Sequence, residues 1–190
     1  KKNRTFQNSN STYQEVMREV LKDTSGAGLN FYASDRRIES PLYQIEETDW
    51  EFIKRLASHL ETAVVPNALM ERPEVSIGLP EGRIYNQDRL NGYGERVWFD
   101  KEKKSVCRRI RTCEDLRIGE RVKWEGLTLT ITEKSCRLEK GLLSFRYVLA
   151  AKGGFFTGRY ENPDAYDRLL PARVLDKKEE KIKVQFDIDK

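Results

Sequence analysis

Few residues of this chain have the types and spacing that catalysis or metal binding requires. The three cysteines, Cys107, Cys113 and Cys136, are an odd set, and five residues separate the first two, which fits neither a disulfide framework nor a zinc knuckle. The single histidine, His59, lies among apolar residues of a helical pattern, so we expect a surface or boundary side chain rather than a base. The sequence therefore predicts no metal site, and a Ser–His or Cys–His dyad could form only through His59.

Carboxylates and glycines offer two further candidates. Asp49 and Glu51 could form a paired-carboxylate site, but they follow Thr48 at the start of a helical pattern, which is typical of helix capping and of a favourable helix dipole. We favour capping. The cluster Asn91-Gly92-Tyr93-Gly94 lacks the preceding strand and following helix of a phosphate-binding loop, and we interpret it as a turn. The sequence thus predicts no catalytic residue and no cofactor.

The composition indicates a folded and highly charged chain. Of its 190 residues 35% are charged, yet eight Phe, eight Tyr and three Trp are too many aromatic residues for a disordered polyelectrolyte. The net charge of +4 is compatible with binding to an acidic surface of a partner, but it does not require that the partner is nucleic acid. No apolar run approaches the roughly 18 residues of a membrane span. Because the chain begins without Met and stops at Lys190 inside an alternating pattern, we interpret it as a piece of a longer protein.

The first half of the chain predicts two capped helices. After a polar, turn-prone stretch over residues 1–11, capping boxes at residues 12–15 and 48–51 each begin a helix, and residues 25–28 end the first one. We expect Trp50 to anchor the second helix in the core. Its apolar stripe is Trp50, Ile53, Leu56, Ala57 and Leu60, with Phe52 beside it. Short strands are expected near residues 42–45, 63–65 and 74–79.

The second half predicts antiparallel β-structure. From about Arg96 the apolar pattern alternates, with strands expected near residues 97–99, 127–132 and 145–149 and turns between them. Residues 172–188 predict a hairpin whose apolar face two strands cannot bury alone. The expected fold class is α+β: a small helical and sheet domain, then an antiparallel β-barrel, then a hairpin that opens a further OB-like β domain.

Residues 47–60, E-T-D-W-E-F-I-K-R-L-A-S-H-L, resemble the signature E-x-D-W-x-F-x-x-R-L-A of the late-control gene D/VgrG family. These proteins are hubs of contractile phage tails, phage-like particles and secretion spikes. Three further features agree in order: Ser11–Val16 with an S/T-Y-x-x-V helix, Ile77–Pro80 with an F-G-x-P-like strand end, and Leu116–Val122 with L-x-x-G-D-x-V. The resemblance implies structural roles for Asp49, Trp50, Phe52, Arg55, Leu56, Ala57, Gly119 and Val122.

The resemblance also implies an organisation and a role. Residues 1–94 would form the helix and strand domain between the two barrels of a hub, residues 95–172 the second barrel, and residues 173–190 the start of an OB-like domain. The function implied is a noncatalytic hub that adapts a sixfold tail tube to a trimeric spike, without a cofactor. Its implied partners are further copies in a homotrimer of the full-length protein, tail tube and baseplate proteins, and a spike, with no membrane in the resting state. Its implied location is the bacterial cytoplasm during assembly and then the tail of the particle.

Two other functions remain to be weighed. The run of residues 101–104 with Arg108, Arg109 and Arg111, next to Trp98 and Phe99, could neutralise phosphates and stack bases in a nucleic-acid-binding β domain. Interspersed Asp and Glu residues favour a solvated connection instead, so nucleic acid is the less favoured partner. A peptidoglycan hydrolase would need a catalytic acid in a cleft, and nothing in the sequence brings a pair of carboxylates together.

Overall fold

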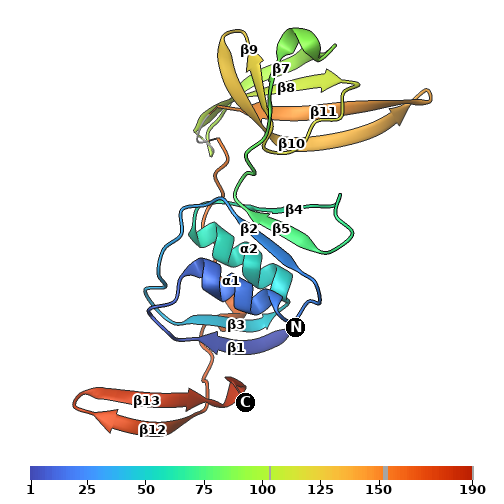
Figure 1. The fold of residues 1–190 in the computed structure, drawn as a ribbon. Helices are drawn as coiled ribbons and strands as arrows, with labels where there is room; N and C mark the ends of the chain where they lie inside the picture. The colour runs from blue at the N-terminus through green and yellow to red at the C-terminus, as the bar shows by residue number, and fades with distance from the viewer. Residues whose placement is uncertain (103, 152–153, 190) are drawn as a thin grey trace.

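The computed structural model describes residues 1–102, 104–151 and 154–189 and has an α+β fold. Three parts follow one another along the molecule: a helical unit, a curled six-stranded sheet and a C-terminal hairpin (Figure 1). In the view of Figure 1 the helical unit lies between the other two parts.

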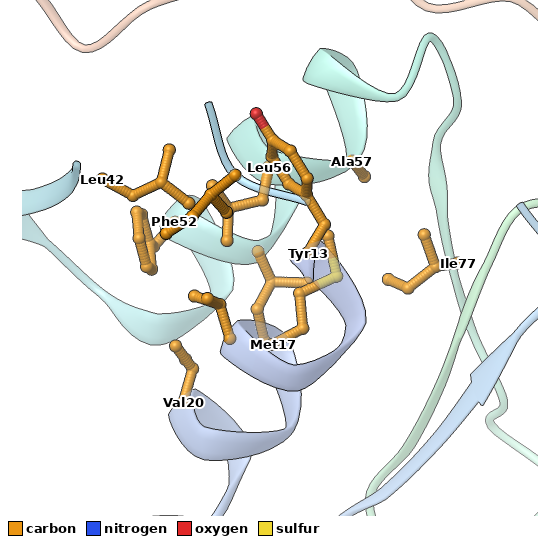
Figure 2. Packing of buried hydrophobic residues seen from close by; sticks show 11 residues of the cluster. Tyr13, Met17, Val20, Leu42, Phe52, Leu56, Ala57 and Ile77 are labelled. Carbon is orange, nitrogen blue, oxygen red and sulfur yellow. The ribbon is translucent and has the colours of Figure 1, made fainter. Parts of the chain in front are cut away.

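Two helices form the centre of the helical unit. Helix α1 (Tyr13–Leu21) and helix α2 (Asp49–His59) both begin with the predicted capping boxes, in which the hydroxyls of Thr12 and Thr48 accept from Glu15 and Glu51. Val16, Met17 and Val20 of α1 pack against Phe52, Ile53 and Leu56 of α2 in the core shown in Figure 2.

Two small sheets flank these helices. Strand β1 (Lys2–Phe6) pairs with β3 (Leu42–Glu47), and β5 (Glu74–Ile77) lies between β2 (Gly28–Phe31) and β4 (Val64–Pro66). The expectation of a turn-prone stretch over residues 1–11 is wrong for residues 2–6. The segment that contains Lys2 and Arg4 forms a strand because β3, which lies about forty residues later in the sequence, supplies its hydrogen-bonding partner.

The expectation that Trp50 anchors α2 in the core is also wrong. Trp50 is 41% exposed, and the Lys54 ammonium lies 6.0 Å from its ring centroid. Phe52 is fully buried and takes the place in the core that the pattern assigned to Trp50. At about 100° per residue Trp50 lies about 120° around the helix from Leu56, whereas Phe52 lies about 40° from it. The core side of α2 is therefore centred nearer Phe52 and Leu56.

The six-stranded sheet has the order β6-β9-β10-β11-β8-β7. Its buried side chains include Ile110, Val122, Ile131, Tyr147 and Leu149. The sheet already begins at Ile84, earlier than the change of pattern near Arg96. The interpretation of residues 91–94 as a turn is wrong for Tyr93 and Gly94, which are the first two residues of β7 and pair with β8. The strands are β6 (Ile84–Asn86), β7 (Tyr93–Asp100), β8 (Ser105–Thr112), β9 (Arg121–Trp124), β10 (Leu127–Glu139) and β11 (Leu142–Ala150), with a 3-10 turn, η1, at Gln87–Arg89.

After β11 the chain returns to the helical unit and then forms the predicted hairpin. Residues 155–165, called the return segment here, lead through the 3-10 turn η2 (Pro163–Ala165) to β12 (Ala172–Lys178) and β13 (Lys181–Phe186). A last turn, η3 (Asp187–Asp189), meets β1, where the Asp189 carboxylate accepts from the Thr5 amide at 2.6 Å and from the Thr5 hydroxyl. The predicted hairpin is thus confirmed, and it is attached to the N-terminal strand.

Candidate functional site

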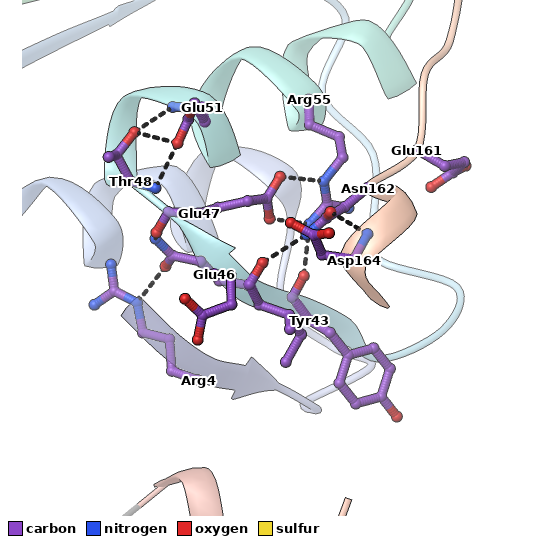
Figure 3. A network of polar contacts seen from close by, with 12 residues as sticks. Arg4, Tyr43, Glu46, Glu47, Thr48, Glu51, Arg55, Glu161, Asn162 and Asp164 are labelled. Carbon is purple, nitrogen blue, oxygen red and sulfur yellow. Dashed lines mark hydrogen bonds and ion pairs between the residues drawn. The ribbon is translucent and has the colours of Figure 1, made fainter. Parts of the chain in front are cut away.

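A buried ion pair joins α2 to the strand before it. The Arg55 guanidinium donates to both oxygens of the Glu47 carboxylate, at 2.8 Å from Nε and 2.7 Å from Nη2 (Figure 3). Its Nη2 also donates to the Tyr43 carbonyl at 2.5 Å, and the guanidinium lies 5.0 Å from the Phe52 ring centroid. Both charged residues are buried. A bidentate pair of this geometry fixes the angle between β3 and α2, because both partners have defined directions.

Asp49 binds the N-terminal strand. Its carboxylate accepts from Lys2 Nζ and Arg4 Nη2, each at 2.7 Å, and from Gln44 Nε2 at 3.1 Å. Burial acts to raise the pKa of Asp49, but the hydrogen bonds from Lys2 and Gln44 and the charge of Arg4 outweigh it and hold that pKa below its ordinary value. The expectation that Asp49 takes part in capping is wrong, because its carboxylate holds β1 instead; its place in the first turn of α2 still agrees with a favourable helix dipole.

Glu51 behaves as a capping residue. Its carboxylate accepts from the Thr48 amide and hydroxyl, both at 2.8 Å, while the Glu51 amide donates back to the Thr48 hydroxyl. The hydrogen bonds from Thr48 lower the pKa of Glu51. Asp49 and Glu51 therefore have separate partners and do not form a carboxylate pair, and the capping interpretation is confirmed for Glu51.

A close backbone contact joins the helical unit to the six-stranded sheet. A Cβ atom added to Gly119, which has φ +90°, would lie 2.1 Å from the Pro80 carbonyl oxygen. Next to it, the Arg121 amide donates to the Arg83 carbonyl at 2.8 Å. Only glycine permits both this backbone conformation and this approach. The two flanking motifs of the sequence, residues 77–80 and 116–122, thus meet at one point, and Val122 enters the core of the sheet.

The return segment makes a second connection to the helical unit. The Tyr160 amide donates to the Ser58 hydroxyl at 3.2 Å, and the Asn162 side-chain amide donates to the Ile45 carbonyl at 2.7 Å. Asn162 is itself buried. The chain therefore leaves the helical unit at Pro80, forms the sheet and binds again beside α2, so that two segments connect the two parts (Figure 1).

His59 is buried beneath this return segment, so the expectation of a surface or boundary position is wrong. Its side chain is 2% exposed, with Nδ1 3.4 Å from the Tyr13 hydroxyl and Nε2 3.5 Å from a Glu161 carboxylate oxygen. Burial lowers the pKa of His59, as do the charges of Arg159 and Arg55, and Glu161 only partly opposes them. The covering residues lie about 100 positions along the chain, which a helical pattern cannot reveal.

The arrangement around His59 does not resemble a nucleophile and its base. Its ring lies near the Tyr13 hydroxyl, the Glu161 carboxylate and the Tyr160 backbone, whereas the neighbouring Ser58 hydroxyl donates to the Arg55 carbonyl at 2.6 Å. Among the residues that the structure describes, no cluster of three His, Cys, Asp or Glu side chains could hold a metal ion. Cys107 is buried, and Cys113 and Cys136 are exposed.

The basic residues considered for nucleic acid are partly compensated. The Arg111 side chain donates to Glu95 at 2.9 Å and to Glu139 at 3.1 Å, and Arg108 pairs with Glu125. The guanidinium groups of Arg96 and Arg109 lie 5.7 and 5.5 Å from the Trp98 ring centroid. Lys103 of the basic run lies outside the described residues. Within residues 1–102, 104–151 and 154–189, the helices are too short or too polar to traverse a bilayer.

Comparisons with known proteins show a likeness to a solved structure. No family model matches the sequence, and no curated protein matches it. Among solved structures the chain is similar to the tail protein from Neisseria meningitidis MC58, with 10% sequence identity and a TM-score of 0.49. The match covers 81% of this chain and 71% of that chain.

Proposed function

We propose that the chain is a structural, noncatalytic part of a contractile-tail hub, which adapts a sixfold tail tube to a trimeric spike. In this proposal residues 1–94 form the domain between two barrels, residues 95–172 form the second barrel, and residues 173–190 begin an OB-like domain. The partners are tail tube and baseplate proteins, a spike and further copies of the chain. The protein acts in the tail of the particle after assembly in the bacterial cytoplasm.

The observation that carries the proposal is where the residues of the resemblance lie. Glu47 and Arg55 form the buried pair that fixes α2 against β3, and Gly119 touches Pro80 where the chain passes from the helical unit to the sheet. Phe52, Leu56 and Ala57 fill the core of the same helical unit. Such residues suit a protein that must transmit force between two parts without changing their angle, because each sets the geometry of a connection.

The noncatalytic part of the proposal rests on the polar side chains. The buried charged groups Glu47 and Arg55 are paired with each other, and Asp49 is satisfied by three donors. An active site usually presents an ionisable group with a shifted pKa to a cleft, whereas these groups are paired with one another and hold strands and helices together. A mechanical role uses the same contacts without further chemistry.

The experiment that tests the proposal is purification of contractile-tail particles from the source bacterium, followed by quantitative mass spectrometry. The proposal expects this protein in intact particles at three copies for each spike. A matched preparation from a strain lacking the tail genes is the control. Absence of the protein from intact particles, or recovery in the lysate only, contradicts the proposal.

A further inference from the structure

The return segment (residues 155–165) is attached more loosely than the two parts that it joins. Within these residues no strand or helix forms before η2, and most of the side chains are exposed. Besides the hydrogen bonds of Tyr160 and Asn162 to the helical unit, the Thr157 amide reaches the Glu61 carbonyl only at 3.4 Å. Segments with few buried contacts open before the elements beneath them. We therefore expect the return segment to detach while α2 and the six-stranded sheet stay folded.

This segment covers the single histidine of the chain. The His59 side chain is 2% exposed, and the centroid of its ring lies 6.0 Å from that of Tyr13, which meets it edge-on from α1. From the return segment a Glu161 carboxylate oxygen lies 3.5 Å from Nε2, and the Tyr160 backbone also lies close to the ring. Detachment of the return segment would therefore open the imidazole to water.

The charges around His59 favour its neutral form. Burial lowers the pKa of His59 most, the charges of Arg159 and Arg55 add to this, and Glu161 only partly opposes them. Glu161 also holds a second cation, because its carboxylate accepts from Arg159 Nε at 2.6 Å. The groups that face this site are Tyr13 of α1, Arg55 of α2 with its partner Glu47, Arg36 and Glu39 between β2 and β3, and Arg159, Tyr160 and Glu161 of the return segment.

We propose that the return segment is an acid-released latch, in which protonation of His59 favours detachment of residues 155–165 from α2. In the closed state the imidazolium is buried beside two guanidinium groups, whereas in the open state it is hydrated. A proton that binds the open state more tightly shifts the population toward that state. Release removes one of the two connections between the helical unit and the sheet and leaves the contact of Pro80 with Gly119. This device goes beyond the hub role and does not depend on it.

The test is hydrogen exchange of the whole chain, measured by mass spectrometry at about pH 7.5 and about pH 5 and corrected for the pH dependence of intrinsic exchange. With the ordinary pKa of 6.5 for an exposed His59, the open population rises at most about thirty-fold between these two values. Peptides from residues 155–165 are expected to lose protection several-fold. Peptides from β8 and β11 are expected to change by less than about two-fold, because opening of the latch leaves the sheet folded.

His59→Gln is the matched variant, because it keeps a neutral polar side chain that cannot gain a proton in this range. It is expected to abolish the pH dependence of protection in residues 155–165, and thermal melting at neutral pH checks that it is folded. The parent protein gives an independent measurement, because the NMR signal of its single imidazole reports the titration directly. A titration midpoint at or above 6.5, or equal protection of the return segment at both pH values, overturns the proposal.

Glu161→Gln tests the direction of the effect. It removes the carboxylate that lies 3.5 Å from the ring and favours the charged form, so the loss of protection on acidification is expected to be larger in this variant. If Glu161 instead held the protonated ring and closed the latch, protection in the parent protein would rise on acidification, which overturns the proposal. An equal loss of protection in the return segment and in the sheet also contradicts it, because acid would then act on the whole fold.

Discussion

Replacing Arg55 with methionine tests whether the buried ion pair holds α2 in place. The substitution keeps much of the side-chain length but leaves the Glu47 carboxylate buried without its bidentate partner. Removing one partner of a buried pair costs about 3–5 kcal/mol. Since about 1 kcal/mol lowers the melting temperature by about 2–4 °C in a chain of this size, we expect a decrease of about 6–20 °C.

The assay is thermal unfolding followed by circular dichroism at a helical wavelength, because α1 and α2 both lie in the unit that the pair stabilises. Arg18→Met is the matched control, since Arg18 is an exposed arginine of α1. The double variant Glu47→Gln with Arg55→Met removes the uncompensated charge and is expected to lose less stability than the two single variants together, with a coupling of about 0.5–3 kcal/mol. An Arg55→Met protein as stable as the Arg18→Met control, or strictly additive losses, would refute the reasoning.

Three further predictions follow from the same contacts. Phe52→Ala is expected to lower the free energy of unfolding by about 3–5 kcal/mol, and Trp50→Ala by less than about 1 kcal/mol. Denaturant titration compares the two variants, and equal losses would contradict the burial of Phe52 in place of Trp50. Gly119→Ala is expected to cost at least about 1–3 kcal/mol from its backbone conformation, with the contact to Pro80 adding to this, and a melting temperature equal to that of the parent protein would refute it. The pKa of His59 is lowered in the folded protein, so the unfolded chain binds the proton of this group more readily. The contribution of His59 to the free energy of unfolding is therefore complete above its ordinary pKa of 6.5 and is lost as pH falls toward the folded value. His59→Gln should flatten the dependence of stability on pH between about pH 5 and 7, and an unchanged slope would contradict the prediction.

Local signals predicted the helices and the hairpin because their physics is local. Thr12 and Thr48 each cap a helix with a residue three positions later, and hydroxyl and carboxylate satisfy the first amides wherever the helix lies. The hairpin at residues 172–186 follows from an alternating pattern interrupted by a charged turn. The α+β fold class follows from the change of period between the two halves.

Long-range contacts explain what the sequence did not reveal. Lys2 and Arg4 form a strand because Gln44 and Asp49 receive their side chains, and no window of a few residues contains both groups. His59 is buried by a segment about 100 residues away. The apolar stripe of the second helix indicated Trp50 as a core residue, whereas Phe52, two residues later, is the one that packs inside.

The roles of the residues at the junctions depend on contacts that no local pattern encodes. Glu47 and Arg55 are eight residues apart, a separation that crosses the start of a helix and so has no simple period. The resemblance implied a structural role for Gly119 without saying which, and its close approach to Pro80 depends on how the sheet meets the helical unit. These residues were recognised as a pattern, and the structure gives them physical contacts.

The most direct measurement for the central claim is cryo-electron microscopy of contractile-tail particles from the source bacterium, focused on the junction between tube and spike. The proposed hub role predicts three copies of the helical unit and curled sheet at that junction, with both connections between them intact. The same particles from a strain in which this gene is deleted should lack that density and fail to join the tube to the spike. Particles whose tube and spike join normally without the protein would contradict the hub role.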